Sequence, residues 1–169
     1  ENAAIKIEKK EALSYIIHFR NRLINRSLNN LIINKLCDKA GNCTENLSVE
    51  FTPVWAETGD IVITEIMADP APEVALPDKE FIEITNRTDY SFNLKDWLLR
   101  AGDQSYPLPE TIIQPGGIHI LCLSADESAF NRFGKVTGLK QFPTLTDGGR
   151  MIFLTDSTGL LIHGLDYSS

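Results

Sequence analysis

Residues 59–99 read GDIVITEIMADPAPEVALPDKEFIEITNRTDYSFNLKDWLL. Two runs rich in Ile, Val, Phe and Thr, residues 60–68 and 80–86, have the composition of β-strands, and a proline-rich acidic loop separates them. A third short run, residues 97–100, follows the turn-forming group NRTD. This stretch therefore predicts strands joined by turns, and it carries no motif of a known reaction.

The same alternation of strands and turns continues to the end of the chain. The groups QPGG, DGG and DSTG are turn signals between further strands, which we expect at residues 118–124, 150–155 and 160–167. Residues 125–133 are different, because Ser124 or Asp126 can cap a short helix there. In such a helix Phe130 and Phe133 would pack inward. The pattern predicts an antiparallel β-sandwich of about seven strands with one helical turn.

The first segment of the chain is also rich in strand-forming residues. The runs EALSYIIHFRN, NNLIINKL and NLSVEFTPV predict three strands, and the last two should form a hairpin of residues 31–36 and 46–51. Asp38 can bond to the turn backbone, and Gly41 can supply the positive φ that the hairpin needs. A helix over residues 8–31 is the disfavoured alternative, because YIIHF suits a half-buried strand and the asparagines are weak helix formers.

The loop DKAGN, residues 38–42, resembles the loop before the final strand of a bacterial immunoglobulin-like repeat. The resemblance implies that residues 1–54 are the C-terminal part of such a repeat, whose first strands would lie upstream of Glu1. The exposed sheet edge must then be covered by the second domain or by another chain. Strand exchange or a homodimer through this edge is therefore expected.

Residues 60–169 contain a series of motifs in a fixed order: ITEIMADP, EFIEITNRT, FNLKDWLL, LPETIIQPGG, IHILCLS and FPTLTDGGRMIFLTDSTGLLIHGLDYS. The series resembles the lamin tail domain, in the form found in exported, multidomain bacterial proteins. The resemblance implies an immunoglobulin-like β-sandwich, and Thr64 and Asp96, where Asn and Gly are usual, do not affect that fold. We expect a partial immunoglobulin-like β segment at 1–54, a linker at 55–59 and the lamin-tail-like domain at 60–169.

Several residues of types that often act in binding or catalysis are expected to be structural here. Trp97 has apolar neighbours on both sides, so we expect it in the sandwich core together with Phe81 and Leu94, among others. The three histidines stand in separate strand-like runs without a partner motif for zinc or catalysis, and we expect strand-face residues: His18, His119 and His163.

The carboxylates of residues 59–99 are the best candidates for a site. If the strands that carry Glu65 and Glu83 are neighbours, these two carboxylates would lie side by side and require a cation, a shared proton or an arginine. A Ca²⁺ ion would need six to eight oxygen ligands, to which Asp69 and Asp78 could contribute. No DxDxDG spacing is present, so no metal site and no cofactor is expected, and these four residues are the weak candidates.

Cys37 and Cys43 bracket the DKAGN loop and would face each other across the hairpin. In an oxidising compartment they could form a disulfide, and in a reducing one they would remain two thiols. Cys122 lies in the apolar run ILCL, where a small buried residue is expected.

The net charge of −7 argues against sequence-independent nucleic-acid binding, which depends on clustered Lys and Arg. No run is long and apolar enough for a transmembrane segment. We therefore expect a non-catalytic structural or interaction module of a larger exported protein, located in the periplasm, on the cell surface or outside the cell. Its partners would be neighbouring domains or other envelope proteins. The alternative is an accessory module that binds Ca²⁺ or a glycan for an attached enzyme.

Overall fold

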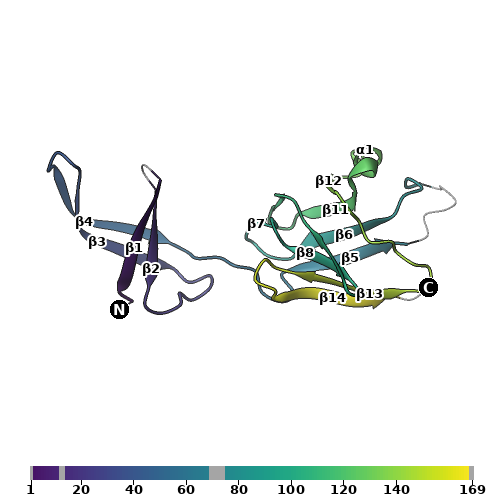
Figure 1. Ribbon diagram of the computed structural model, residues 1–169, viewed down its shortest axis with the longest axis horizontal. Helices are drawn as coiled ribbons and strands as arrows, with labels where there is room; N and C mark the ends of the chain where they lie inside the picture. Colours follow the sequence, from purple (N-terminus) through teal and green to yellow (C-terminus); the bar gives the residue numbers. More distant parts are fainter. Residues whose placement is uncertain (1, 12–13, 69–74, 168–169) are drawn as a thin grey trace. The chain divides into compact units, whose positions relative to one another are not determined.

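The computed structural model describes residues 2–11, 14–68 and 75–167. The chain divides into two compact units, Glu1–Trp55 and Ala56–Ser169, which are called the N-terminal and C-terminal units below (Figure 1). Strands dominate both units, and the helical residues follow one another in a single short segment. Within the described ranges, no helix has the length and apolar character needed to cross a membrane.

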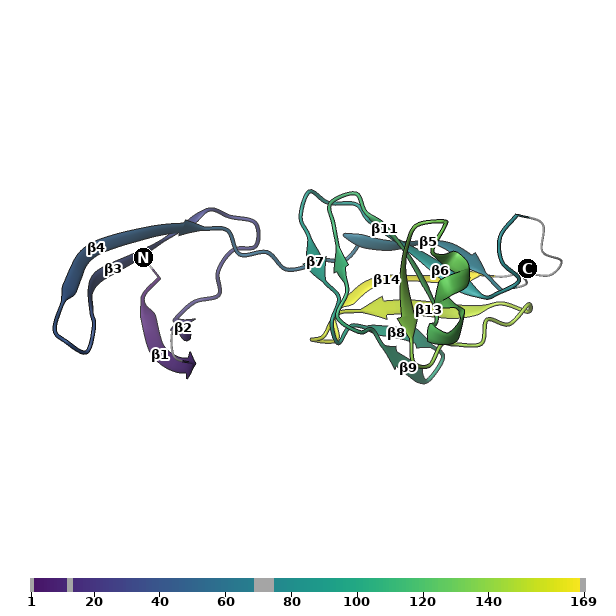
Figure 2. The same cartoon turned by 90° about the horizontal axis from the view of Figure 1, so that it is seen from above.

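The N-terminal unit consists of two antiparallel hairpins. The first pairs β1 (Ala4–Glu11) with β2 (Ser14–Phe19), and the second pairs β3 (Asn29–Cys37) with β4 (Cys43–Phe51). Figure 2 shows the second hairpin as a long curved ribbon separate from the first. Three strands were predicted in this segment, and the structure has four, so this prediction is wrong by one strand. β1 was missed because Lys and Glu alternate with its isoleucines, which hides a strand that is exposed on both faces.

The turn between β3 and β4 has the geometry expected from DKAGN. The Asp38 carboxylate accepts hydrogen bonds from the backbone of Ala40 and Asn42, both at 2.9 Å, and from the Asn42 side chain at 2.8 Å. Gly41 has a φ of 89°, which side-chain-bearing residues rarely adopt. The hydrogen bond from the Asn42 side chain, followed by those from the backbone, lowers the pKa of Asp38.

The C-terminal unit is a sandwich of two four-stranded sheets. The first has the order β12 (Lys135–Leu139), β11 (Ile118–Leu123), β6 (Phe81–Asn86), β5 (Ile61–Met67). The second has the order β14 (Leu161–Tyr167), β13 (Arg150–Thr155), β8 (Leu98–Ala101), β9 (Gln104–Pro107). A small sheet joins β7 (Phe92–Asn93) to β10 (Ile112–Ile113). The predicted β-sandwich is confirmed, although β11 and β12 pair in parallel, through a connection that contains η1 (Ser124–Asp126) and α1 (Glu127–Phe130).

The core of this unit lies between the two sheets. Trp97 is 5% exposed and Leu94 is fully buried there, and both pack with aliphatic side chains of the facing strands. Phe81 is also buried, but it belongs to a smaller cluster on the opposite face of the first sheet, where its ring lies 5.3 Å from that of Phe130 (Figure 1 shows α1 over this sheet). Phe133 is 38% exposed, so the expectation that it packs inward is wrong. The helix ends at Phe130, one turn too early to aim Phe133 at the sheet.

The two sheets meet where β5 approaches β14. The backbone N–H of Gly59 donates to the carbonyl of Ile162 at 2.8 Å, and the Thr58 hydroxyl donates to the carbonyl of Leu161 at 2.6 Å. Ala56 is buried in the core of this unit. Residues 55–59, expected as a linker, thus include three residues that contact the sandwich.

Candidate functional site

The acidic residues of β5 and β6 are brought together by a β-bulge. Glu65 and Glu83 are direct register partners in this antiparallel pair, and the register shifts between Ile63 and Glu65. The extra residue, Thr64, therefore lies on the same exposed face, while Ile63 still points into the core. The Thr64 hydroxyl donates to Oε1 of Glu83 at 2.6 Å. Two carboxylates and a threonine hydroxyl thus share one surface of the first sheet.

Asp78 lines a separate pocket of about 330 Å³, in which Nζ of Lys79 lies 3.8 Å from Oδ1 of Asp126. Asp69 lies outside the described residues. Among the residues that the structure describes, no group of three or more His, Cys, Asp or Glu side chains is positioned to hold a metal ion.

Glu80 lines the same pocket as Asp78 and has a structural partner. Its Oε1 accepts a hydrogen bond from the backbone N–H of Leu145 at 3.1 Å. Burial raises the pKa of Glu80, and the nearby Asp147 raises it further. This carboxylate therefore holds the segment before β13 against β6.

The three histidines lie on three different strands. Nε2 of His18, on β2, lies 3.5 Å from Oε2 of Glu8 on β1, at an exposed position. His119, on β11, is 8% exposed, and its pKa is lowered by burial and by Lys135. Nδ1 of His163, on β14, accepts a hydrogen bond from the backbone of Ile63. These positions give the histidines structural environments rather than a shared site.

The cysteines have two different states. Cys37 and Cys43 are the register partners that close the β3–β4 turn, and a disulfide joins them. Cys122 is a free, fully buried thiol. Burial raises the pKa of Cys122 to about 11, with smaller contributions from Glu127 and Asp126, so it is protonated at neutral pH.

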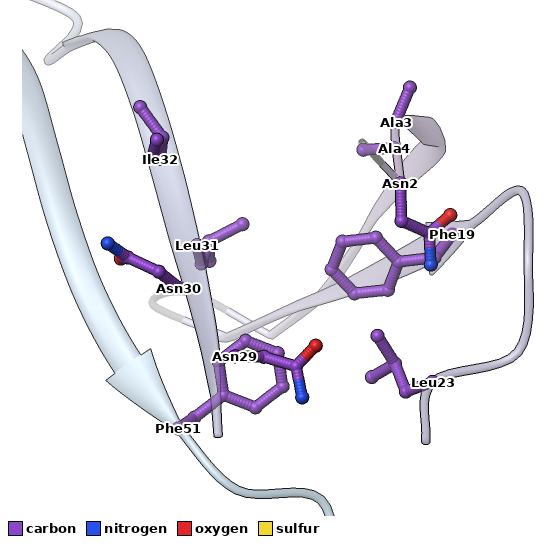
Figure 3. Close-up of a pocket in the computed structure, with 10 residues that line it drawn as sticks. All are labelled: Asn2, Ala3, Ala4, Phe19, Leu23, Asn29, Asn30, Leu31, Ile32 and Phe51. Carbon is purple, nitrogen blue, oxygen red and sulfur yellow. The ribbon is translucent and has the colours of Figure 1, made fainter. Parts of the chain in front are cut away.

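A partly apolar groove lies between the two hairpins of the N-terminal unit, as Figure 3 shows. Phe19 and Leu23 reach into it from one side, and Leu31 and Phe51 reach into it from the other. The space has a volume of about 530 Å³ and is open to solvent. Polar side chains at its rim include Asn29, whose amide donates to the carbonyl of Ser27 at 2.6 Å.

The apolar character of the N-terminal unit extends beyond this groove. None of the described residues 2–11 and 14–55 is buried. Large apolar side chains that are at least 36% exposed are Ile5, Ile7, Tyr15, Ile16, Ile24, Leu28, Ile32, Leu36, Val49 and Val54. Sequence reasoning missed this surface, although the alternation of isoleucine with charged residues in β1 was a signal for an exposed strand.

The comparisons with known proteins address the C-terminal unit. The family model of the lamin tail domain matches residues 56–169, which begin at the boundary between the two units. None of the curated proteins matches the chain.

Proposed function

Because the chain belongs to the lamin tail domain family, whose members share a non-enzymatic immunoglobulin-like sandwich, we propose that it is a structural or interaction module of a larger exported protein. The C-terminal unit supplies a closed, self-contained sandwich, and the N-terminal unit supplies the surface that associates. Its partners are neighbouring domains or other proteins of the cell envelope.

The observation that carries this proposal is the contrast in burial between the two units. The C-terminal unit encloses a continuous core, whereas the N-terminal unit leaves ten large apolar side chains exposed. Exposed apolar surface of this extent is typical of a binding surface rather than of an isolated domain. Two polar side chains are hydrogen-bonded to the backbone of the fold: His163 accepts from Ile63, and Glu80 accepts from Leu145.

Export is supported by the disulfide, because such bonds persist in oxidising compartments and are rare in the cytosol. Charge supports a protein partner over nucleic acid. The C-terminal unit contains 17 of the 23 acidic residues and eight of the 16 basic ones, so its net charge is −9.

Two measurements test the proposal. The whole chain, assayed against a panel of glycoside, ester and phosphoester substrates, should show no turnover; activity that is lost in Glu83→Gln would overturn the non-catalytic role. Export is tested by blocking thiols at lysis of the native cells. Cys37 and Cys43 should escape the blocking reagent until a reductant is added, and their labelling before reduction would contradict export.

A second candidate function is an accessory module that binds Ca²⁺ or a glycan, and the pairing of Glu65 with Glu83 favours it. Two adjacent carboxylates attract a hard cation, but further oxygen ligands would have to come from the ligand or a partner. Calorimetry with Ca²⁺ decides the metal part. Binding heat that disappears in Glu65→Gln but persists in the surface control Glu110→Gln supports this candidate, and no heat with no change in melting temperature removes it.

A further inference from the structure

His119 is buried without a hydrogen-bond partner for one of its ring nitrogens. It lies near the start of β11 and is 8% exposed, and its buried Nδ1 bonds to none of the residues that the structure describes. Side chains alternate along a strand, and Leu121 belongs to the core between the sheets, so His119 faces this core too. A neutral imidazole needs only one donor, whereas a protonated one must donate from both nitrogens. Protonation therefore places a charge and an unsatisfied donor inside the sandwich.

The register identifies the residues beside His119 on the two neighbouring strands. On β6 it is Ile84, which is fully buried and uncharged, and on β12 it is Lys135. Further along the same face of β12, the Thr137 hydroxyl lies 3.4 Å from that of Thr111. Burial, followed by the charge of Lys135, lowers the pKa of His119, and no carboxylate of the described residues contributes. A positive charge on His119 would thus meet a lysine and no counter-ion.

β12 is the strand of this sheet that can separate with the least loss of contacts. It is an edge strand of five residues, and it pairs with β11 alone, in parallel. Parallel pairing is slightly less stable per residue than antiparallel pairing. β6, on the other side of β11, is paired on both of its edges. Separation of β12 would admit water to His119 and remove Lys135 from its side, at a lower cost than unfolding of the whole unit.

We propose that protonation of His119 releases β12 from β11 while the rest of the sandwich stays folded. The proton comes from the solvent and returns to it when β12 pairs again, so the change is reversible. This property goes beyond the structural or interaction role proposed above, because it makes the exposure of one surface of the C-terminal unit depend on pH.

Cys122 is a natural reporter of this opening. It is a free, fully buried thiol, and its register partner on β12 is Gly138. Val136, also on β12, packs against the small apolar cluster that contains Cys122. Separation of β12 therefore exposes the Cys122 thiol, whereas Cys37 and Cys43 remain joined in their disulfide and do not react with a thiol reagent.

The test measures how fast a dipyridyl disulfide reagent labels Cys122 in the full chain, without reductant, at a series of pH values. Each rate is divided by the rate of glutathione at the same pH, which removes the pH dependence of the thiol reaction itself. The imidazole of the open form has the ordinary pKa of about 6.5, so between about pH 7.5 and about pH 5 the corrected rate should rise ~tenfold, with one proton taken up per opening.

His119→Gln removes the titrating group and keeps a polar side chain, so its corrected labelling rate should not change with pH, whatever its absolute value. The matched control is His163→Gln, which removes the histidine of β14 whose pKa is also lowered by burial. This control should keep the ~tenfold rise of the unchanged chain. Lys135→Gln should reduce the rise, because it removes the charge that repels the protonated imidazole.

Hydrogen exchange followed by mass spectrometry locates the opening without any variant. As the pH falls, and after correction for the intrinsic exchange rates, the amides of residues 135–139 should lose protection while those of β13 keep it.

Three outcomes overturn the proposal. The first is a corrected labelling rate of Cys122 that does not change with pH, and the second is an equal rise in His119→Gln and in the unchanged chain. The third is a parallel loss of protection in β12 and β13, which would show that acid unfolds the whole unit rather than releasing one strand.

Discussion

The backbone N–H of Ile63 donates a hydrogen bond to Nδ1 of His163 over 3.2 Å. Ile63 lies on β5 and His163 on β14, so this contact joins an edge strand of one sheet to an edge strand of the other. Nδ1 can accept this bond only when it carries no proton. Burial, and to a smaller extent Arg87, lowers the pKa of His163, which keeps the imidazole in the accepting form.

The stability of the C-terminal unit should therefore fall as the pH falls. Because the folded pKa of His163 lies below its unfolded value of 6.5, the unfolded state binds the proton first. The contribution is fully present above pH ~6.5 and is lost as the pH falls through the lowered folded pKa. His119, whose pKa is also lowered, acts in the same direction.

Urea unfolding at pH 7.5 and 5.5 measures this dependence. His163→Gln is the informative variant, because the amide oxygen of glutamine can accept the bond from Ile63 at both pH values. Its stability should depend less on pH than that of the unchanged chain. An equal pH dependence in the two proteins would show that His163 does not contribute.

Gly138→Ala should destabilise the C-terminal unit by about 1–3 kcal/mol, as overpacking of a close contact usually does. A Cβ at Gly138 would lie 2.7 Å from Cα of Ser124, and backbone cannot move aside as a side chain can. Gly148→Ala is the matched control, because its Cβ would meet no atom within 4 Å. Thermal unfolding compares the two variants, and equal midpoints would contradict the close approach of β12 to η1.

Asn86→Ala should lower the free energy of unfolding of the C-terminal unit by at least ~2 kcal/mol, since several backbone groups would lose their hydrogen-bond partner. The Asn86 amide donates to the carbonyls of Tyr90 at 2.6 Å and Gln114 at 2.8 Å, and its oxygen accepts from the Thr88 backbone at 3.0 Å. Asn93 is exposed, so Asn93→Ala should lower the free energy of unfolding much less. Chemical denaturation of both variants tests this, and a similar small loss in the two would mean that the Asn86 network is dispensable.

Reduction of the disulfide should lower the stability of the N-terminal unit and leave the C-terminal unit unchanged. Cys37 and Cys43 close a loop with a sequence separation of six, so the entropic stabilisation is at most ~2 kcal/mol. The double variant Cys37→Ser with Cys43→Ser should reproduce the effect of reductant. A further loss when reductant is added to that variant would indicate that another thiol is involved.

Composition and turn residues were sufficient to predict most strands of the C-terminal unit, because Gly, Pro, Asp or Asn lies next to each of them and all except β8 carry β-branched residues. β12 was missed because its pairing with β11 is parallel and depends on the length of the α1 connection rather than on a local turn. Glu65 and Glu83 were predicted to lie side by side only if their two strands are neighbours. The register that places them opposite each other is set by the bulge at Thr64, which the local composition does not indicate.

The groove of the N-terminal unit could not be predicted at all. It depends on how two hairpins lie against each other, and Phe19 and Phe51 are 32 positions apart in the chain. The alternation of residues along a strand predicts the face on which each phenylalanine lies. It does not predict how the two hairpins are placed relative to each other, and the groove depends on that placement.

Each unit contains one tryptophan, so the unfolding of the two units can be followed separately. Trp55 lies in the N-terminal unit, with the guanidinium of Arg22 4.8 Å from its ring, and Trp97 lies in the core of the C-terminal unit. In Trp97→Phe the fluorescence reports the N-terminal unit, and in Trp55→Phe it reports the C-terminal unit. Both variants are unfolded in urea at the same protein concentration.

The Trp55 signal should disappear at a lower urea concentration, because none of the described residues of the N-terminal unit is buried. The Trp97 signal should disappear at a higher urea concentration, because the C-terminal unit encloses a continuous core. A single transition, at the same urea concentration for both tryptophans, would contradict the claim that this chain joins a self-contained sandwich to a unit without a buried core.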